Sequence, residues 1–219
     1  MIGRVTMSGV LPHVFAGMED MEPLCGSKVW MRNVEFRRGG RYLLKAASGT
    51  GKTSLVSFLF GLRDDYSGLI EFDGCDIRRF GVGRWCGLRM RALAFLPQEM
   101  RLFPDLTVME NIEIKNRLTG HKSPQEIEDM LQRLEVSDKL RSKASTLSLG
   151  QQQRVAVVRA LCQPFDFLLL DEPVSHLDDR NNVAVADLVS EVAASSGAAI
   201  IATSVGNDLK LDNPEIIDL

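Results

Sequence analysis

The residues with the clearest chemical character form one short run, residues 46–54, with the sequence Ala-Ala-Ser-Gly-Thr-Gly-Lys-Thr-Ser. A short apolar run, Tyr42 to Leu44, precedes it, and a helical pattern follows it. Small residues let consecutive backbone N–H groups turn toward an anion, and the helix N-terminus adds its positive dipole end. Lys52 supplies a charge for β- and γ-phosphates, and the Thr53 hydroxyl a ligand for Mg²⁺. The run predicts a phosphate-binding loop.

The residues expected around the phosphates are Ala47, Ser48, Gly49, Thr50, Gly51, Lys52, Thr53 and Ser54. Ala46 departs from the phosphate-loop pattern because it occupies the position of the first glycine. Alanine fits a tight turn there only if its φ remains negative. The alternative interpretation is an ordinary turn rich in Gly, Ser and Thr ahead of a helix.

Two carboxylates, Asp171 and Glu172, follow the apolar run Phe165 to Leu170, which is typical of a buried parallel strand. Ligands of open α/β sheets bind at the carboxyl ends of the strands, where the predicted phosphate loop also lies. We therefore expect both carboxylates to face the same phosphates. Asp171 then holds Mg²⁺ through its water shell, and Glu172 polarises the attacking water as a general base. The alternative is an Asp-Glu pair that ends a strand at the surface.

The N-terminal part of the chain is expected to be rich in β-structure. Apolar runs within residues 1–45, including residues 29–31, predict short antiparallel strands, and residues 66–77 predict a hairpin around an Asp-Gly turn. Trp30 and Phe36 are candidates for stacking on a nucleotide base in this region, although a core position is the favoured interpretation of either residue.

The rest of the chain is expected to alternate helices and strands. Capping-box patterns at Ser123 and Ser148 predict the starts of two helices, and residues 197–203 predict a second buried strand. Strands and helices that alternate around a phosphate loop predict an α/β fold with a parallel core sheet.

The composition is that of an ordinary globular protein, with 219 residues, 25% charged and 45% hydrophobic residues and a net charge of −3. That charge argues against bulk attraction to nucleic acid or to an anionic membrane. The four cysteines lack metal-ligand spacing, and Cys162 fits a buried thiol in a reducing compartment. No secretory signal and no apolar span of about 20 residues is present in the sequence, so we expect a cytoplasmic protein.

The order of these motifs resembles that of the ATP-binding cassette (ABC) ATPases over nearly the whole chain. Residues 46–54 resemble the Walker A motif and residues 168–172 the Walker B motif. Gln98 occupies the position of the family's Q-loop glutamine, which binds Mg²⁺ and senses the γ-phosphate. Residues 147–151, Leu-Ser-Leu-Gly-Gln, resemble the signature motif, and residues 175–178, Ser-His-Leu-Asp, resemble the D-loop.

The resemblance implies an α/β P-loop NTPase (RecA-like) fold. Such a fold has a parallel-sheet core, an N-terminal antiparallel β region and an inserted helical subdomain. The chain is then a single nucleotide-binding domain over residues 1–219. We expect the β region and P-loop core over about 1–90, the helical subdomain with the signature helix over about 99–160, and the Walker B core over about 161–219.

The resemblance also implies that two copies of the chain bind two ATP molecules, with Mg²⁺, in a head-to-tail dimer. The residues expected to contact the nucleotide of the other copy are Ser148, Leu149, Gly150, Gln151 and Asp178. The metal ligands expected within one copy are Thr53, Gln98 and Asp171. The residues expected to act in catalysis are Glu172, Lys52, Gln98 and Ser204. The alternative for the signature segment is a helix cap with no ligand.

Three residues depart from the family pattern. Ala46 and Leu149 each replace a glycine, and Ser204 occupies the position of the family's switch histidine. Serine is shorter and uncharged, so it reaches a γ-phosphate only through a bridging water. His176 lies in the D-loop segment and does not take the switch role. Because Lys52 and Glu172 are present, we expect hydrolysis to persist at a reduced rate.

The leading interpretation is an ATPase subunit that drives a separate integral-membrane permease from the inner face of the cell membrane, with no nucleic-acid partner. Its compact layout is most similar to lipoprotein-release, macrolide-export and cell-division ATPases. The expected permease contact includes Leu102, Phe103 and Pro104, which follow the Q-loop glutamine. The sequence does not indicate which substrate is transported or in which direction.

Three alternatives remain at this point. One is a regulatory module that dimerises on nucleotide with weak hydrolysis, which Ser204 and Leu149 favour. Another is a soluble ABC ATPase that acts on ribosomes or DNA, although the second cassette, basic linker or coiled-coil insertion typical of those proteins is missing from this sequence. A P-loop kinase would leave the signature motif unexplained.

Overall fold

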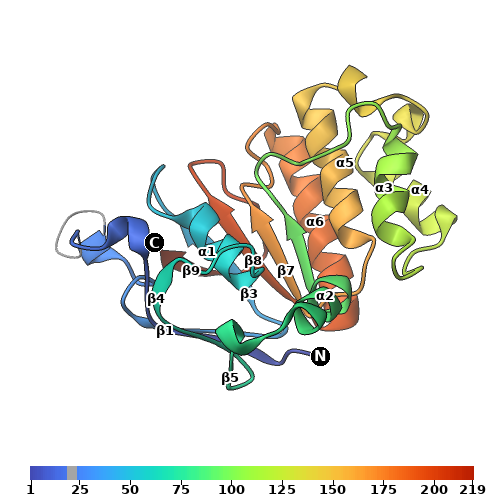
Figure 1. Cartoon of the computed structure of the whole chain (residues 1–219). Helices are drawn as coiled ribbons and strands as arrows, with labels where there is room; N and C mark the ends of the chain where they lie inside the picture. Colours follow the sequence, from blue (N-terminus) through green and yellow to red (C-terminus); the bar gives the residue numbers. More distant parts are fainter. Residues whose placement is uncertain (19–23) are drawn as a thin grey trace.

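The computed structural model describes residues 1–18 and 24–219 of the chain. Two β-sheets and a group of helices build the fold (Figure 1). The N-terminal sheet is antiparallel, with the strand order β2 (Asn33–Arg37), β1 (Arg4–Pro12), β4 (Tyr66–Phe72) and β5 (Cys75–Asp76). Strands β4 and β5 meet at the Asp73-Gly74 turn, so the predicted hairpin is confirmed.

The core sheet is parallel throughout. Its strand order is β6 (Leu93–Leu96), β7 (Phe167–Asp171), β8 (Ala199–Ser204), β3 (Arg41–Lys45) and β9 (Glu215–Asp218). Every residue of β7 and β8 is buried, as expected for central parallel strands that are covered on both faces. The carboxyl ends of β3, β7 and β8 lie next to one another, and they carry the segments with the predicted chemistry.

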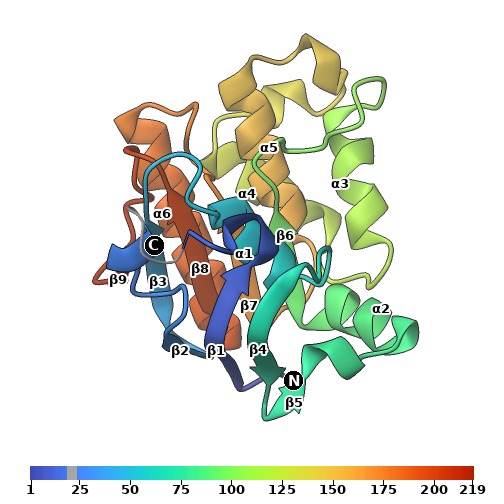
Figure 2. The ribbon, with the colours of Figure 1, turned by 60° about the vertical axis from the view of Figure 1, so that its left-hand side comes forward.

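The helices are α1 (Lys52–Leu59), α2 (Val82–Arg91), α3 (Val108–Asn116), α4 (Pro124–Arg133), α5 (Leu149–Leu161) and α6 (Asp179–Ser196). Helix α1 lies between the two sheets, whereas α3, α4 and α5 lie together on the other side of the core sheet (Figures 1 and 2). The capping boxes predicted at Ser123 and Ser148 are both present, so the starts of α4 and α5 are confirmed.

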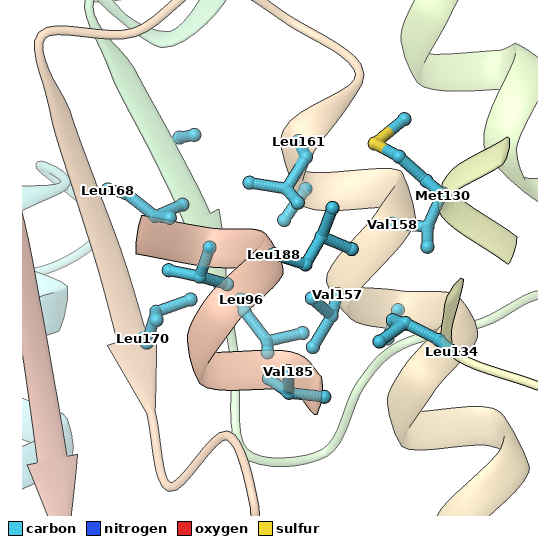
Figure 3. Close-up of a cluster of buried hydrophobic side chains, with 14 of the residues drawn as sticks. Leu96, Met130, Leu134, Val157, Val158, Leu161, Leu168, Leu170, Val185 and Leu188 are labelled. Carbon is cyan, nitrogen blue, oxygen red and sulfur yellow. The ribbon is translucent and has the colours of Figure 1, made fainter. Parts of the chain in front are cut away.

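Two hydrophobic clusters cover the two faces of the core sheet. Leu168 and Leu170 of β7 point to the helical side, while Leu169 points to α1 and the N-terminal sheet. This alternation follows the two-residue period of a strand. Figure 3 shows the helical-side cluster, in which Leu168 and Leu170 meet side chains of α5 and α6, among them Val157 and Val185. The packed sheet fixes the ends of its strands, and therefore the site.

The α/β class, the parallel core and the N-terminal antiparallel region are confirmed. The prediction of a strand at residues 29–31 is wrong, because this segment forms a turn. The Ser27 hydroxyl accepts hydrogen bonds from the backbone N–H groups of Val29 (3.1 Å) and Trp30 (2.9 Å), and Met31 has a φ of 59°. An apolar run can be buried in a turn when its side chains are needed in the core, and Trp30 is fully buried.

Candidate functional site: the phosphate loop and the strand ends around it

The loop of residues 46–54 joins β3 to α1, and Lys52 is the first residue of that helix. Gly49 and Gly51 have φ values of 84° and 96°, a backbone conformation that favours glycine. Ala46 is not among the residues with positive φ, so alanine at this position meets the condition that the turn imposes. The loop therefore has the strand–loop–helix context that a phosphate loop requires.

Two aromatic side chains, Trp30 and Phe15, pack against this loop. The Trp30 indole N–H donates a hydrogen bond to the Thr50 carbonyl at 2.8 Å. A Cβ atom added to Gly51 would lie 2.9 Å from Trp30 and 3.0 Å from Phe15, so no larger residue fits at that position. Trp30 and Phe36 are both fully buried, so both candidates for stacking on a base belong to the core instead.

A cavity of about 300 Å³ opens in front of the loop. It is lined by Val14, Phe15, Ser48, Gly49, Gly51, Lys52, Thr53, Ser54, Gln98 and Glu172. Phe15 belongs to a short 3₁₀ turn, His13–Phe15, that directly follows β1. The cavity thus combines backbone N–H groups, one cation, one carboxylate and one aromatic ring.

Charged groups from two segments meet in this cavity. Lys52 is buried, and its Nζ donates a hydrogen bond to the Ala47 carbonyl at 2.5 Å. Burial lowers the pKa of Lys52 below its ordinary value of 10.5, while the charges of Glu172 and Asp171 act in the opposite direction. The Gln98 amide donates to a Glu172 carboxylate oxygen at 3.2 Å. The structure therefore brings together Lys52, Gln98 and Glu172, which lie far apart in the sequence.

The three predicted metal ligands also lie together. Thr53, Gln98 and Asp171 line a second hollow of about 130 Å³. Asp171 is buried at the end of β7, where one carboxylate oxygen accepts a hydrogen bond from the Thr203 hydroxyl at 2.7 Å. Its other oxygen, Oδ2, is buried without a hydrogen-bond partner among the described residues. Because a buried unpaired carboxylate oxygen is costly, this atom fits a cation ligand.

The signature segment forms the N-terminus of α5. Ser148 is the N-cap, its hydroxyl accepts a hydrogen bond from the Gln151 N–H, and the Gln151 side chain accepts one from the Ser148 N–H at 3.0 Å. Leu149 is 56% exposed. A Cβ on Gly150 would lie 3.1 Å from the His176 carbonyl, which accounts for the second glycine.

Asp178 lies at the end of the loop that joins β7 to α6 and is the N-cap of α6. The backbone N–H of Asn181 donates to it at 2.9 Å, and its bonds from Asn181 hold the pKa of this carboxyl below its usual range. Neither Asp178 nor any signature residue lines the cavity around Lys52. One copy of the chain therefore does not bring these two groups of residues together.

The sequence reasoning missed Gln153, which connects the signature helix to the carboxylates. This buried residue of α5 donates to the Glu172 carbonyl at 3.0 Å and to the Ser175 hydroxyl at 3.2 Å. Its amide oxygen accepts a hydrogen bond from the His176 N–H at 3.0 Å. Gln153 is the last of three consecutive glutamines, residues 151–153, so its type alone did not distinguish it from its neighbours.

The structure places Ser204 at the end of β8, directly beside Lys45 of β3. Ser204 is buried, and its hydroxyl donates a hydrogen bond to Asp208 at 2.5 Å. The other carboxylate oxygen of Asp208 pairs with the Lys45 ammonium. Burial acts to raise the pKa of Asp208, but the bonds from Lys45 and Ser204 outweigh it and hold that pKa below its ordinary value of 3.8. Ser204 does not line the cavity around Lys52.

Phe15 and Thr203 are further residues that the sequence reasoning missed. Phe15 lines the cavity, and Thr203 also accepts a hydrogen bond from the Glu172 N–H at 3.1 Å. Thr203 ends an apolar strand beside Asp171, which was a usable signal. Phe15 had no such signal, because it follows β1 and lies more than 30 residues before the loop that it contacts.

The phosphate loop, the paired strand-end carboxylates and the capped signature helix on this α/β frame define an ATP-binding cassette. The chain belongs to the ABC transporter family, whose profile matches residues 31–175. In the part of the chain that the structure describes, no helix is long and apolar enough to span a membrane.

Curated relatives include an uncharacterized ABC transporter ATP-binding protein of Mycobacterium tuberculosis, 30% identical over 92% of this chain, which spans 61% of that relative. The lipoprotein-releasing system ATP-binding protein LolD of Buchnera aphidicola is 33% identical, over 78% of this chain and 76% of its own. The macrolide export ATP-binding/permease protein MacB of Nitrosomonas europaea is 35% identical, over 78% of this chain and 26% of its own.

Solved structures show the same fold. The dimeric ABC transporter cassette MJ0796 superposes with a TM-score of 0.78 at 21% identity, over 98% of this chain and 94% of its own. A second dimeric structure of MJ0796, bound to ADP and Pi, has a TM-score of 0.74 at 21% identity, over 91% of this chain and 87% of its own.

Proposed function

We propose that the chain binds and hydrolyses ATP, dimerises around two ATP molecules and drives a separate membrane permease. The observation that carries this proposal is the convergence of Lys52, Gln98 and Glu172 on one cavity in front of a phosphate loop. Phe15, on the cavity wall, is placed to support the base of the nucleotide.

Within one copy, the loop residues from Ala47 to Ser54 bind the phosphates through backbone N–H groups, and Lys52 supplies the positive charge. Mg²⁺, when bound, neutralises charge that develops on the phosphate oxygens. Thr53, Gln98 and Asp171 would hold it, since they line one hollow and Asp171 retains an unpaired carboxylate oxygen. Most of the remaining ligands of such an ion come from phosphate and water.

Glu172 acts as the general base. Its carboxylate lies in the same cavity as Lys52 and accepts a hydrogen bond from Gln98, which orients it. A φ of 50° holds its backbone in the left-handed region, and the N–H of Glu172 is fixed by Thr203. In this role Glu172 takes a proton from the water that attacks the γ-phosphorus, while the bond from that phosphorus to the bridging oxygen breaks and ADP leaves.

The signature residues complete the site of a second copy. Ser148 and Gly150 begin α5, where N–H groups and the helix dipole favour an anion, and Leu149 is exposed beside them. Asp178 ends the loop that begins at Glu172. A second copy that contacts Asp178 would therefore act on the position of Glu172 through this loop. The likeness to cassettes whose solved structures are dimeric supports a dimer of this chain.

The permease contact is proposed at residues 102–104. Phe103 is 52% exposed, although its backbone is held firmly by the buried Asn111. Asn111 accepts a hydrogen bond from the Phe103 N–H at 2.7 Å and donates to the Phe103 carbonyl at 3.1 Å. An exposed aromatic ring on a fixed backbone suits a protein contact, and such a contact would hold the chain at the inner face of the membrane.

A regulatory dimerisation module with weak hydrolysis is the second candidate. The observation that favours it is the commitment of the Ser204 hydroxyl to Asp208, away from the cavity around Lys52. ATP would then hold the two copies together, and the dimer would separate slowly because hydrolysis is weak.

ATP hydrolysis by the purified chain distinguishes these functions, with Glu172→Gln as the test variant and Glu128→Gln as the control. Glu128 is exposed on α4 and lines neither site cavity. We expect the native chain to turn over, Glu172→Gln to lose more than about 100-fold in rate and to accumulate as an ATP-bound dimer, and the control to match the native chain. A native chain that already stalls as an ATP-bound dimer supports the regulatory module. If the native chain shows no turnover and forms no ATP-dependent dimer, both proposals are overturned.

A further inference from the structure

The segment of residues 204–208, which begins at the last residue of β8, connects two parts of the site. At one end, Lys45 is the last residue of β3 and immediately precedes the phosphate loop. Its ammonium group pairs with one carboxylate oxygen of Asp208, while the other oxygen accepts a hydrogen bond from the Ser204 hydroxyl at 2.5 Å. Strands β3 and β8 lie side by side (Figure 2), and Lys45 is in register with Ser204. The base of the phosphate loop is therefore tied to this segment by an ion pair.

At the other end, the neighbouring residue Asn207 holds the loop that follows the Walker B strand. Its amide donates hydrogen bonds to the carbonyls of Val174 (2.7 Å) and Leu177 (3.1 Å). That loop begins at Glu172 and ends at Asp178, so both its catalytic and its dimer-facing residue depend on its position. Asn207 therefore holds residues of this loop that Gln153 does not bond to.

A buried asparagine holds the bridging segment in place. Asn182 of α6 is fully buried, and its amide donates to the Asn207 side chain at 3.0 Å and to the Asp208 carbonyl at 2.8 Å. The side-chain oxygen of Asn182, Oδ1, accepts a hydrogen bond from the Lys210 backbone N–H at 3.1 Å. The segment is thus attached to α6, to the Glu172 loop and, through one ion pair, to the phosphate loop.

We propose that Lys45 and Asp208 are positioning residues for ATP hydrolysis, which set the Glu172 loop against the phosphate loop. The inference rests on the proposed function. It adds to it that the Lys45–Asp208 ion pair links the phosphate loop to the Glu172 loop, although position 204 is a serine and not a histidine. Ion pairs exposed to solvent contribute little to stability, and both side chains here are between one third and two fifths exposed. The consequence of breaking this pair is therefore expected in geometry, and so in turnover, more than in folding.

The test compares Lys45→Gln, Asp208→Asn and the charge-exchanged double variant Lys45→Asp/Asp208→Lys. We expect each single variant to lose about tenfold in kcat with KM for ATP within about twofold of the native value, because the phosphate contacts are unchanged. The double variant restores the ion pair with opposite polarity, so it recovers most of the lost kcat. A role in folding alone would instead lower the thermal unfolding temperature of the single variants together with their kcat.

The control is Lys28→Gln, which breaks an ion pair of 2.7 Å with Asp218 on the neighbouring strand β9. Asp218 lies in register with Lys45, but its carboxylate pairs with Lys28 outside the bridging segment, so we expect kcat and KM to remain native. Thermal unfolding and ATP binding of all variants verify that the compared proteins are folded and loaded.

A second readout separates this inference from the proposed function. In a Glu172→Gln background, sedimentation measures ATP-dependent dimerisation, and we expect each single variant to weaken the dimer about tenfold and the double variant to restore it. Turnover of the native chain tests the proposed function by itself. The inference is overturned if both single variants stay within twofold of native in kcat and dimer affinity, or if the double variant is as impaired as the single ones.

Discussion

Replacement of Trp30 by phenylalanine tests how the phosphate loop is held from behind. The substitution removes the indole N–H that donates to the Thr50 carbonyl at 2.8 Å, and Thr50 is only 3% exposed. A buried carbonyl left without a partner costs about 1–3 kcal/mol. The smaller ring also leaves a void, which adds about 1 kcal/mol at a fully buried site.

The free energy of unfolding is therefore expected to fall by about 2–4 kcal/mol in Trp30→Phe, measured by urea unfolding. Since Trp30 also packs where a side chain on Gly51 would lie, the loop loses definition, and ATP affinity falls about three- to tenfold in a fluorescent-nucleotide titration. Phe36→Leu is the matched control, because Phe36 is equally buried but its ring packs against Tyr42 of β3, and a phenylalanine side chain has no hydrogen bond to give to the loop.

The control should lose stability without losing ATP affinity. The reasoning is refuted if Trp30→Phe binds ATP as tightly as Phe36→Leu does, or if its stability changes by less than about 0.5 kcal/mol. Equal losses of affinity in both variants would mean that general destabilisation, and not the hydrogen bond to the loop, sets the affinity.

Two further predictions concern hydrogen bonds near the site and in the helical part. Thr203→Val removes the donor to Asp171 and the acceptor for the Glu172 N–H, so urea unfolding should show a loss of about 2–4 kcal/mol; a change below about 0.5 kcal/mol would contradict it. Glu126→Ala breaks the capping box of α4 and should cost about 1 kcal/mol at pH 7. The backbone hydrogen bond from Ser123 leads the effects that lower the pKa of Glu126 to about 2, from an ordinary 4.5. That contribution is present above pH 4.5 and fades as pH falls toward 2, so the difference in unfolding free energy should be smaller at pH 3.5 than at pH 7.

The sequence was sufficient for features that depend on neighbours along the chain. The phosphate loop needs small residues, one lysine and a helix directly behind it, and these are all adjacent in residues 46–54. The N-termini of α4 and α5 are predictable because Ser123 and Ser148 are each followed, three residues later, by the Glu or Gln of a capping box. The buried strand that ends at Asp171 can be predicted from the sequence because a parallel strand that is covered on both faces consists mainly of apolar residues.

Adjacency also explains the error at residues 29–31. An apolar run indicates burial, but burial is possible in a turn as well as in a strand, and the choice depends on what the side chains meet. Trp30 meets the carbonyl of Thr50, 20 residues away, and Ser27 stabilises the turn that brings it there. Local propensity contains no information about that distant partner.

What only the tertiary structure decided is which side chains share a cavity or a hydrogen bond. It placed Phe15, not Trp30, on the wall of the cavity, and it turned the Ser204 hydroxyl toward Asp208. It also joined Lys45 to Asp208 across two parallel strands. These pairs are separated by long stretches of chain, and their contact is set by the register of the core sheet and the packing of its two faces, which no local pattern specifies.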